Sequence, residues 1–224
     1  MLRAILFDYD GTIVLSEPLH FSAFVEVLAK RGVTLSEAEY YDRYLGWTDE
    51  ECARRMVADL GLAADTAGAL LADKIAAMAA RIAHGVPLAE GARAFLTDAA
   101  ARYPLAIVSA GLRREIVTVL RREALDRFFP VLVAAEDVAV GKPDPEGFLL
   151  ACEQLRIAGC TGLRPSECLV IEDSPKGIAA AHAAGMAVVA LAHTRPMDEL
   201  SEADLVLAGY AAASWPALEV LTRS

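Results

Sequence analysis

The sequence predicts an α/β protein, a doubly wound parallel sheet with a separate helical domain inserted after its first strand. Over residues 87–224, short apolar runs without a polar face alternate with amphipathic segments, as is typical of buried parallel strands connected by helices. A first apolar run stands at the N-terminus, and the next one follows only after a stretch, 15–86, of purely helical periodicity. We therefore expect a core domain of residues 1–14 and 87–224 and a helical domain of residues 15–86.

The composition is that of an acidic globular protein. The chain has 224 residues, of which 55% are hydrophobic, and its 21 Lys and Arg against 31 Asp and Glu give a net charge of -10. Nucleic acids and anionic membranes both require basic surfaces, so we expect neither as a partner. The four cysteines show no CxxC spacing and are expected to be core residues or inert thiols. Without a signal-peptide pattern or a long apolar segment, the expected location is cytoplasmic.

The first strand leads directly into two carboxylates. The apolar run 5–7 is followed by Asp8 and Asp10, and Gly11 breaks the strand. Side chains at i and i+2 of a strand point the same way, so we expect the two carboxylates to be aimed together. Their repulsion is relieved by a cation or a shared proton, and an all-oxygen site suits Mg²⁺, which takes further ligands from a substrate phosphate.

The stretch 15–86 is expected to form several successive helices. Apolar residues recur at helical spacing over 19–28, and an alanine-rich helix is expected from about 65 to 83. Ser36 with Glu39, and Thr48 with Glu51, form capping-box pairs that predict the starts of two more helices. The segments 15–18 and 85–87 are the expected connections to the core.

The second strand of the core, residues 104–108, ends at the hydroxyl of Ser109. Ala110 and Gly111 turn the chain, and a helix is expected over 112–122, before a third strand at 129–134. A hydroxyl beside free backbone N–H groups at a loop and a helix start can hold an anion. Ser109, Ala110 and Gly111 are therefore candidate phosphate-binding residues.

Lys142 lies in a rigid loop. The sequence Gly-Lys-Pro-Asp-Pro at 141–145 contains two prolines, which prevent a helix around Lys142 before the expected helix at 146–157. A lysine in such a loop loses conformational freedom that an ordinary surface lysine keeps. This makes Lys142 a candidate for holding negative charge in a site.

The strand 168–171 is followed by the acidic pair Glu172 and Asp173. A helix is expected from Pro175, with a face of small residues for close packing, then strands at 186–191 and 204–207 and a last helix at 214–221. Because the carboxyl ends of parallel strands lie at one edge of a sheet, we expect Asp8, Asp10 and Asp173 to converge on one cation.

Four of these segments together resemble the motifs of the haloacid dehalogenase-like (HAD) hydrolase superfamily. The DxDGT sequence at 8–12, the strand-end Ser109, the GKPxP sequence at 141–145 and the EDSxxGxxAA sequence at 172–181 match its four motifs in order. The resemblance covers essentially the whole chain. It implies a Rossmann-like core and a small four-helix cap inserted after the first motif.

The resemblance also implies roles for the carboxylates. Asp8 would be the nucleophile and form an aspartyl-phosphate, while the Asp10 side chain would be the general acid and base. Asp8, the main-chain carbonyl of Asp10, and Asp173 would hold Mg²⁺, with Glu172 as an outer or water-mediated partner. The residues alone leave open which carboxylate attacks.

By the same likeness, Ser109 would hydrogen-bond the transferring phosphoryl group, and Lys142 would balance its charge and orient the nucleophile. The dehalogenase and phosphonatase branches of the family lack the second acid of the first motif. Because this chain retains Asp10, phosphate ester hydrolysis is favoured over either of those reactions.

The closer likeness is to the β-phosphoglucomutase-like subgroup, which includes sugar-phosphate and phosphoglycolate phosphatases. His20 matches a histidine that the mutases carry at the start of the cap. Asp49 stands where their phosphate-gripping arginine would fall, and a carboxylate there repels a second phosphate. Trp47, in the same loop, is a candidate for contact with the substrate or for packing between the two domains.

These features favour a Mg²⁺-dependent phosphatase of a small phosphorylated metabolite, a sugar phosphate or similar. A sugar-phosphate mutase is an alternative that predicts dependence on a bisphosphate activator, and a non-catalytic ligand-binding module is a further one. Acidic residues of the cap favour a hydroxyl-rich or amine-bearing substrate. The sequence specifies neither the substrate itself nor the oligomeric state.

Overall fold

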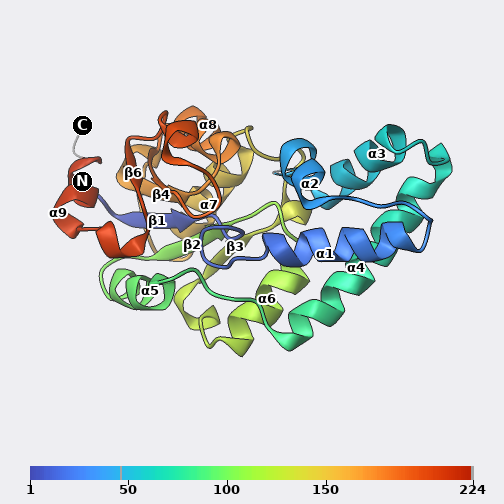
Figure 1. Cartoon of the computed structure of the whole chain (residues 1–224). Coiled ribbons are helices and arrows are strands. Elements are labelled where there is room, and N and C mark those ends of the chain that lie inside the picture. Colours follow the sequence, from blue (N-terminus) through green and yellow to red (C-terminus); the bar gives the residue numbers. More distant parts are fainter. Residues whose placement is uncertain (46, 223–224) are drawn as a thin grey trace. The chain divides into compact units, whose positions relative to one another are not determined.

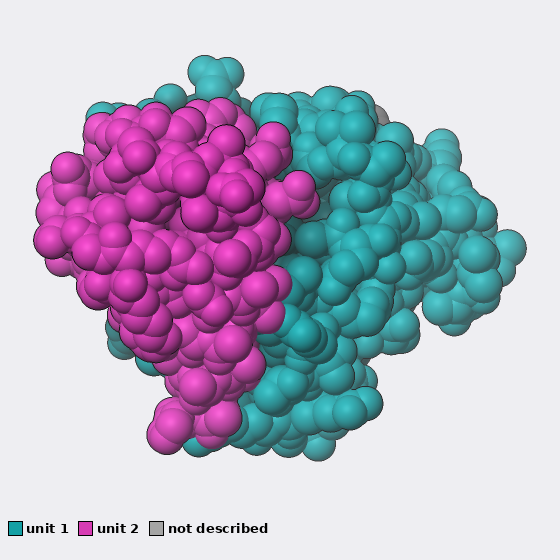
Figure 2. All heavy atoms as spheres, turned by 90° about the vertical axis from the view of Figure 1, so that its right-hand side faces the viewer, with its two compact units in different colours: residues 1–15, 87–224 teal, residues 16–86 magenta. Residues whose placement is uncertain are grey.

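The chain, in a computed structural model that describes residues 1–45 and 47–222, forms two compact units (Figure 2). The core unit comprises residues 1–15 and 87–224, and the helical unit comprises residues 16–86. The core unit contains the sheet, and each unit has its own hydrophobic core.

Within the described residues, six strands form one parallel sheet (Figure 1). Their order is β3-β2-β1-β4-β5-β6, and each neighbouring pair is parallel, which confirms the doubly wound sheet that the sequence predicts. The order reverses between β1 and β4, so ligands are expected at the carboxyl ends of these central strands. The strands are β1 (Ala4–Phe7), β2 (Leu105–Val108), β3 (Val131–Val133), β4 (Cys168–Glu172), β5 (Ala187–Leu191) and β6 (Leu205–Leu207).

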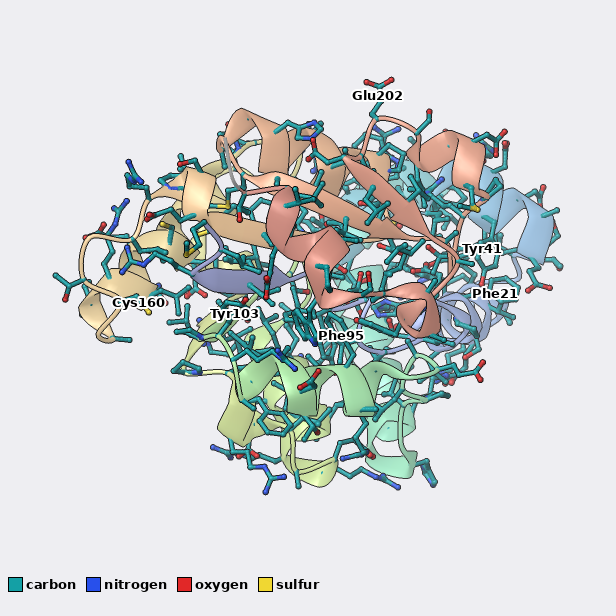
Figure 3. The ribbon with its side chains drawn as sticks, turned by 90° about the vertical axis from the view of Figure 1, so that its left-hand side faces the viewer. Phe21, Tyr41, Phe95, Tyr103, Cys160 and Glu202 are labelled. Carbon is teal, nitrogen blue, oxygen red and sulfur yellow. The ribbon has the colours of Figure 1, made fainter. Side chains whose placement is uncertain are left out.

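Helices cover both faces of this sheet. Successive side chains of β1 point to opposite faces, so neighbouring residues contact helices on different sides. Leu6 belongs to an apolar cluster with residues of α7 and α8, whereas the Phe7 ring meets the Phe95 ring of α5, with centroids 6.2 Å apart. Phe95 points from its helix toward the sheet (Figure 3). The helices of the core unit are α5 (Ala92–Ala100), α6 (Arg113–Arg122), α7 (Glu146–Ile157), α8 (Pro175–Ala183) and α9 (Trp215–Val220).

The chain leaves and re-enters the core unit through two segments that are hydrogen-bonded to each other. The N–H of Leu15 donates to the carbonyl of Pro87 at 2.8 Å, and the N–H of Ala89 donates to that of Ile13 at 2.9 Å. Just before them, the N–H of Gly11 donates to the carbonyl of Val14 at 2.7 Å. These bonds hold the turn after β1, which contains Asp10, against the rest of the core unit.

The helical unit contains α1 (Glu17–Ala29), α2 (Glu37–Arg43), α3 (Asp49–Asp59) and α4 (Ala67–His84). Both expected capping boxes are present, with Ser36 and Thr48 as the N-caps of α2 and α3. The last helix begins at Ala67 rather than near residue 65 because residues 64–66 form a 3₁₀ turn. Among the described helices, none combines the length and the apolar character that a membrane span requires.

Candidate active site

Most residues expected to form the site lie at or just after the carboxyl ends of β1, β2 and β4, and Lys142 lies in the connection between β3 and α7. Phe7 is paired in register with Ile107 of β2 and with Ile171 of β4, so the residues that follow these three positions come together. The strand β1 ends at Phe7, so Asp8 and Asp10 do not share a strand, and the alternation rule does not explain their proximity. Instead, the tight turn after β1 keeps both carboxylates at the edge of the sheet.

Lys142 lies at the centre of this group, and its ammonium uses all three of its protons. The Nζ atom donates to Oδ1 of Asp8 at 2.6 Å, to Oε1 of Glu172 at 2.7 Å, and to the main-chain carbonyl of Val108 at 3.0 Å. Burial lowers the pKa of Lys142, but the negative charges of Asp8 and Glu172 outweigh this effect and hold the pKa above its usual value. Lys142 is therefore a fixed positive charge that orients Asp8.

Glu172 is fully buried, and protein donors occupy both of its oxygens. While Oε1 accepts from Lys142, Oε2 accepts from the backbone N–H groups of Asp173 at 2.8 Å and Ser174 at 2.9 Å, and from the Ser174 hydroxyl at 2.9 Å. The carboxylate thus ties the lysine to the loop after β4. It fits beneath α8 only because Gly177 has no side chain, since a Cβ there would overlap the carboxylate.

Three buried carboxylates, those of Asp8, Glu172 and Asp173, fit a divalent cation. One oxygen from each lies within 4.8 Å of the others, and Oδ2 of Asp8 is buried without a hydrogen-bond donor from the described residues. Burial raises the pKa of Asp8 to about 7, against the opposing effect of Lys142, and burial with the charges of Asp8 and Glu172 raises that of Asp173 well above its usual value. A cation with oxygen ligands relieves this excess of negative charge.

The acidic group differs from the expected convergence of three aspartates, because Glu172 rather than the Asp10 side chain belongs to it. Asp10 lies beside Ser109, whose hydroxyl donates to Oδ2 of Asp10 at 3.3 Å and accepts from the N–H of Gly111 at 2.9 Å. Ala110, which lies between Ser109 and Gly111 in the sequence, is exposed. The arrangement brings together a carboxyl group, a hydroxyl group and a loop N–H, which are the groups that an acid or base and an anion site require in phosphoryl transfer.

One contact to the acidic group is not predicted by the sequence. Thr194, in the loop after β5, donates a hydrogen bond from its hydroxyl to Oδ2 of Asp173. The sequence carries no signal for this, because a threonine among polar loop residues has no distinctive spacing. The contact exists only because β5 pairs with β4 in the folded sheet.

The helical unit contains a charged cluster of its own, formed by His20, Asp49 and Lys74. Lys74 is fully buried on α4, and its Nζ lies 2.8 Å from Nδ1 of His20 and forms an ion pair with Asp49. Nδ1 of His20 is 3.4 Å from Oδ1 of Asp49. Although burial opposes it, bonding to His20 and Lys74 holds the pKa of Asp49 well below its usual range.

The sequence pattern indicates His20 and Asp49 as cap residues of interest but not Lys74. The helical periodicity could have indicated that Lys74 is buried, because Lys74 lies four residues from both Leu70 and Met78, in the apolar stripe of α4. Trp47 precedes the N-cap of α3 and is half-buried, with the guanidinium of Arg55 3.6 Å from the centre of its ring. In the helical unit, therefore, Trp47 stacks on a cation.

The variant Asp49→Asn is expected to destabilise the protein by about 3 kcal/mol, because it leaves the buried ammonium of Lys74 without its counter-charge. Glu50→Gln is the matched control, since it also removes a negative charge from the first turn of α3. The Glu50 partner, Arg54, is exposed and 4.0 Å away, so this variant should lose less than about 0.5 kcal/mol. Urea unfolding measures both, and equal losses would contradict this role of Asp49.

Comparisons with known proteins are consistent with this geometry. A family model described as haloacid dehalogenase-like hydrolase matches residues 2–185. The chain is 32% identical to validoxylamine A 7'-phosphate phosphatase of Streptomyces hygroscopicus subsp. limoneus, over 96% of this chain and 98% of that protein. It is also 32% identical to hexitol phosphatase A of Escherichia coli, over 92% of this chain and 90% of that protein.

Among solved structures, the chain is similar to CbbY from Rhodobacter sphaeroides, in complex with phosphate and, as a mutant, with xylulose 1,5-bisphosphate. The sequence identities are 26% and 25%, and both comparisons cover 98% of this chain and 100% of CbbY with a TM-score of 0.85. The fold, the acidic group and the lysine at its centre thus occur in a chain whose relatives include two proteins named as phosphatases of phosphorylated compounds.

Proposed function

Because the chain belongs to the haloacid dehalogenase-like hydrolases and is a phosphoric monoester hydrolase, we propose that it hydrolyses a sugar or polyol monophosphate through an aspartyl-phosphate on Asp8, with Mg²⁺. The observation that carries the proposal is the Asp8 carboxylate, fixed by Lys142 within a buried acidic group. An ammonium 2.6 Å from Oδ1 orients the carboxylate for attack without removing its charge.

Asp8 and Asp173 would hold Mg²⁺, together with the main-chain carbonyl of Asp10 that the family resemblance adds. The ion would supply the positive charge that lets an anionic phosphate approach an anionic nucleophile. The fit to a divalent cation is supported by the buried Oδ2 of Asp8, to which no described residue donates a hydrogen bond. The preference for Mg²⁺ rests on the all-oxygen ligands.

In the first step, a carboxylate oxygen of Asp8 bonds to phosphorus while the bond from phosphorus to the sugar oxygen breaks. Asp10 donates its proton to that departing oxygen, which leaves as an alcohol. The Ser109 hydroxyl and the Gly111 N–H, which now bond to each other at 2.9 Å, turn to the phosphoryl oxygens. Lys142 can share one of its three protons with the same group.

In the second step, Asp10 takes a proton from the attacking water, whose oxygen bonds to phosphorus. The bond between phosphorus and Asp8 breaks, inorganic phosphate leaves, and both carboxyl groups return to their starting states. One group that first donates and then accepts a proton is what a two-step covalent hydrolysis requires.

We propose that the helical unit is the cap and selects a substrate with a single phosphate. Residues 16–86 contain 7 Lys and Arg against 11 Asp and Glu. Each of these cations is engaged: Lys30 and Arg81 with Glu26, Arg31 with Asp73, Arg43 with Asp59, Arg54 with Glu50, Lys74 with Asp49, and Arg55 with the Trp47 ring. A second phosphate would therefore have to break an existing pair, whereas hydroxyl or amine groups would not.

The testing experiment measures phosphate release from a panel with Mg²⁺ and with EDTA. The panel contains fructose 1-phosphate, a hexitol phosphate, validoxylamine A 7'-phosphate and xylulose 1,5-bisphosphate. We expect release to require the metal, and kcat/KM for at least one monophosphate to exceed that for the bisphosphate by about two- to fivefold, because breaking one of these exposed ion pairs costs about 0.5–1 kcal/mol.

Isomerisation of glucose 1-phosphate is followed in parallel, because a mutase would convert it faster than it releases phosphate. A bisphosphate that is hydrolysed best would contradict the role given to the cap cations. Metal-independent release would contradict the assignment of the acidic group.

A further inference from the structure

Thr194 connects two of the motifs that form the active site. Its hydroxyl donates to Oδ2 of Asp173, and its methyl group lies against the turn after β1, where a Cβ on Gly11 would be 2.8 Å from Cγ2 of Thr194. The same Cβ would overlap the Asp173 carboxylate, so Gly11, with φ of +84°, leaves the space in which threonine and aspartate meet.

We propose that Thr194 is a positioning residue that fixes the Asp173 carboxylate for the metal and thereby sets the metal affinity of the site. The inference rests on the proposed function of Asp173 as a ligand. With Oδ2 held by the hydroxyl, the rotation of the carboxylate is fixed, and Oδ1 accepts no hydrogen bond from the described residues. A side chain that orients a ligand in this way typically changes metal affinity by about 10–100-fold when it is lost.

The loop that carries Thr194 is itself held against the active-site turn. The His193 ring packs edge-on against the Tyr210 ring, with centroids 5.8 Å apart, and the Tyr210 hydroxyl donates to the carbonyl of Thr12 at 3.1 Å. The N–H of Ala192 donates to the carbonyl of Leu207 at 2.9 Å. The two residues before Thr194 are therefore held to the core unit, next to the position from which its hydroxyl orients Asp173.

Two substitutions separate the hydroxyl of Thr194 from its methyl group. Thr194→Val keeps the methyl against Gly11 and loses the hydrogen bond, whereas Thr194→Ser keeps the hydrogen bond and loses the methyl. Thr118→Val is the control, because the Thr118 hydroxyl is exposed on α6 and donates within its own helix, to the carbonyl of Arg114 at 2.6 Å, rather than to a residue of the site.

The experiment is a titration of the substrate-free protein with Mg²⁺ by calorimetry, repeated with Mn²⁺ by electron paramagnetic resonance. We expect Thr194→Val to raise the Kd for both ions about 10–100-fold, and Thr194→Ser and Thr118→Val to stay within about threefold of the wild type. At saturating metal, the kcat of Thr194→Val should differ from that of the wild type by a smaller factor than its metal Kd does. The reason is that the Thr194 hydroxyl contacts Asp173 and not the reacting groups.

Unchanged metal affinity in Thr194→Val would overturn the role of Thr194 and leave the proposed phosphatase mechanism intact. Equal losses in the Val and Ser variants would also overturn it, because packing rather than the hydroxyl would then set the affinity. A wild-type protein that binds neither ion would overturn the metal site itself, and the role of Thr194 with it. Near-ultraviolet circular dichroism of each variant verifies that a folded protein is being titrated.

Discussion

Asp8→Asn is expected to lower the rate of phosphate release by at least about 10³-fold, the largest loss of activity from any single substitution in this chain. The amide of asparagine is not a nucleophile. The substitution also removes the negative charge that pairs with Lys142 at 2.6 Å, and it removes one of the three carboxylates that could hold a metal ion. Its shape is that of aspartate, so the fold should be kept. Asp126→Asn, in an exposed turn, is the control for the substitution itself.

A covalent intermediate distinguishes the nucleophile from a residue that only binds metal. Wild-type protein quenched in acid during turnover of a ³²P-labelled monophosphate should carry label that hydroxylamine removes, as acyl phosphates do. Asp8→Asn should carry none, at any metal concentration. Label on the Asp8→Asn variant, or a rate above about a tenth of the wild type, would transfer the attack to another carboxylate.

Most of the fold and the main residues of the site follow from local patterns in the sequence. Apolar runs without a polar face identify buried parallel strands, and such strands align their carboxyl ends by geometry alone. That is why Asp8, Ser109 and Asp173, which are far apart along the chain, can be grouped by sequence pattern alone. Lys142 joins them because its loop immediately precedes α7, which packs on β2 and β3.

The contacts that could not be predicted depend on side chains meeting across elements. Thr194 reaches Asp173 through the pairing of β5 with β4, and Lys74 reaches Asp49 and His20 through the packing of α4 on α1 and α3. Periodicity describes one element at a time, so it cannot indicate which polar side chains of two elements meet. The place of the Asp10 carboxylate beside Ser109, outside the acidic group, has the same origin, since it depends on where the turn after β1 directs this side chain.

Gly177 illustrates how a correct pattern can have an unexpected cause. The sequence indicates a small residue for close helix packing in α8, and packing is indeed close. The neighbour, however, is the carboxylate of Glu172 rather than an apolar side chain. Glu172 in turn holds Lys142 at 2.7 Å, so the absence of one side chain on a helix supports the charge that orients Asp8.

Gly177→Ala is therefore expected to destabilise the protein, although helix propensity alone predicts the opposite. Replacing a helical glycine by alanine gains about 1 kcal/mol in an open position. Here the new Cβ would overlap a buried carboxylate that accepts four hydrogen bonds, and displacing it costs overpacking strain and charge-assisted bonds of about 1–3 kcal/mol each. The cost exceeds the gain, and we expect a net loss of about 2–4 kcal/mol.

Gly68→Ala is the matched substitution, because Gly68 lies in the first turn of α4 with no atom within 4 Å of the position its Cβ would take. It should leave stability unchanged or raise it by up to about 1 kcal/mol, with normal activity. Denaturant unfolding and phosphate release are measured for both variants. Gly177→Ala should lose at least about tenfold in kcat, because a displaced Glu172 no longer fixes Lys142 beside Asp8. If the two variants behaved alike, the Glu172 carboxylate would not need the space, and the link from α8 through Lys142 to the nucleophile would be wrong.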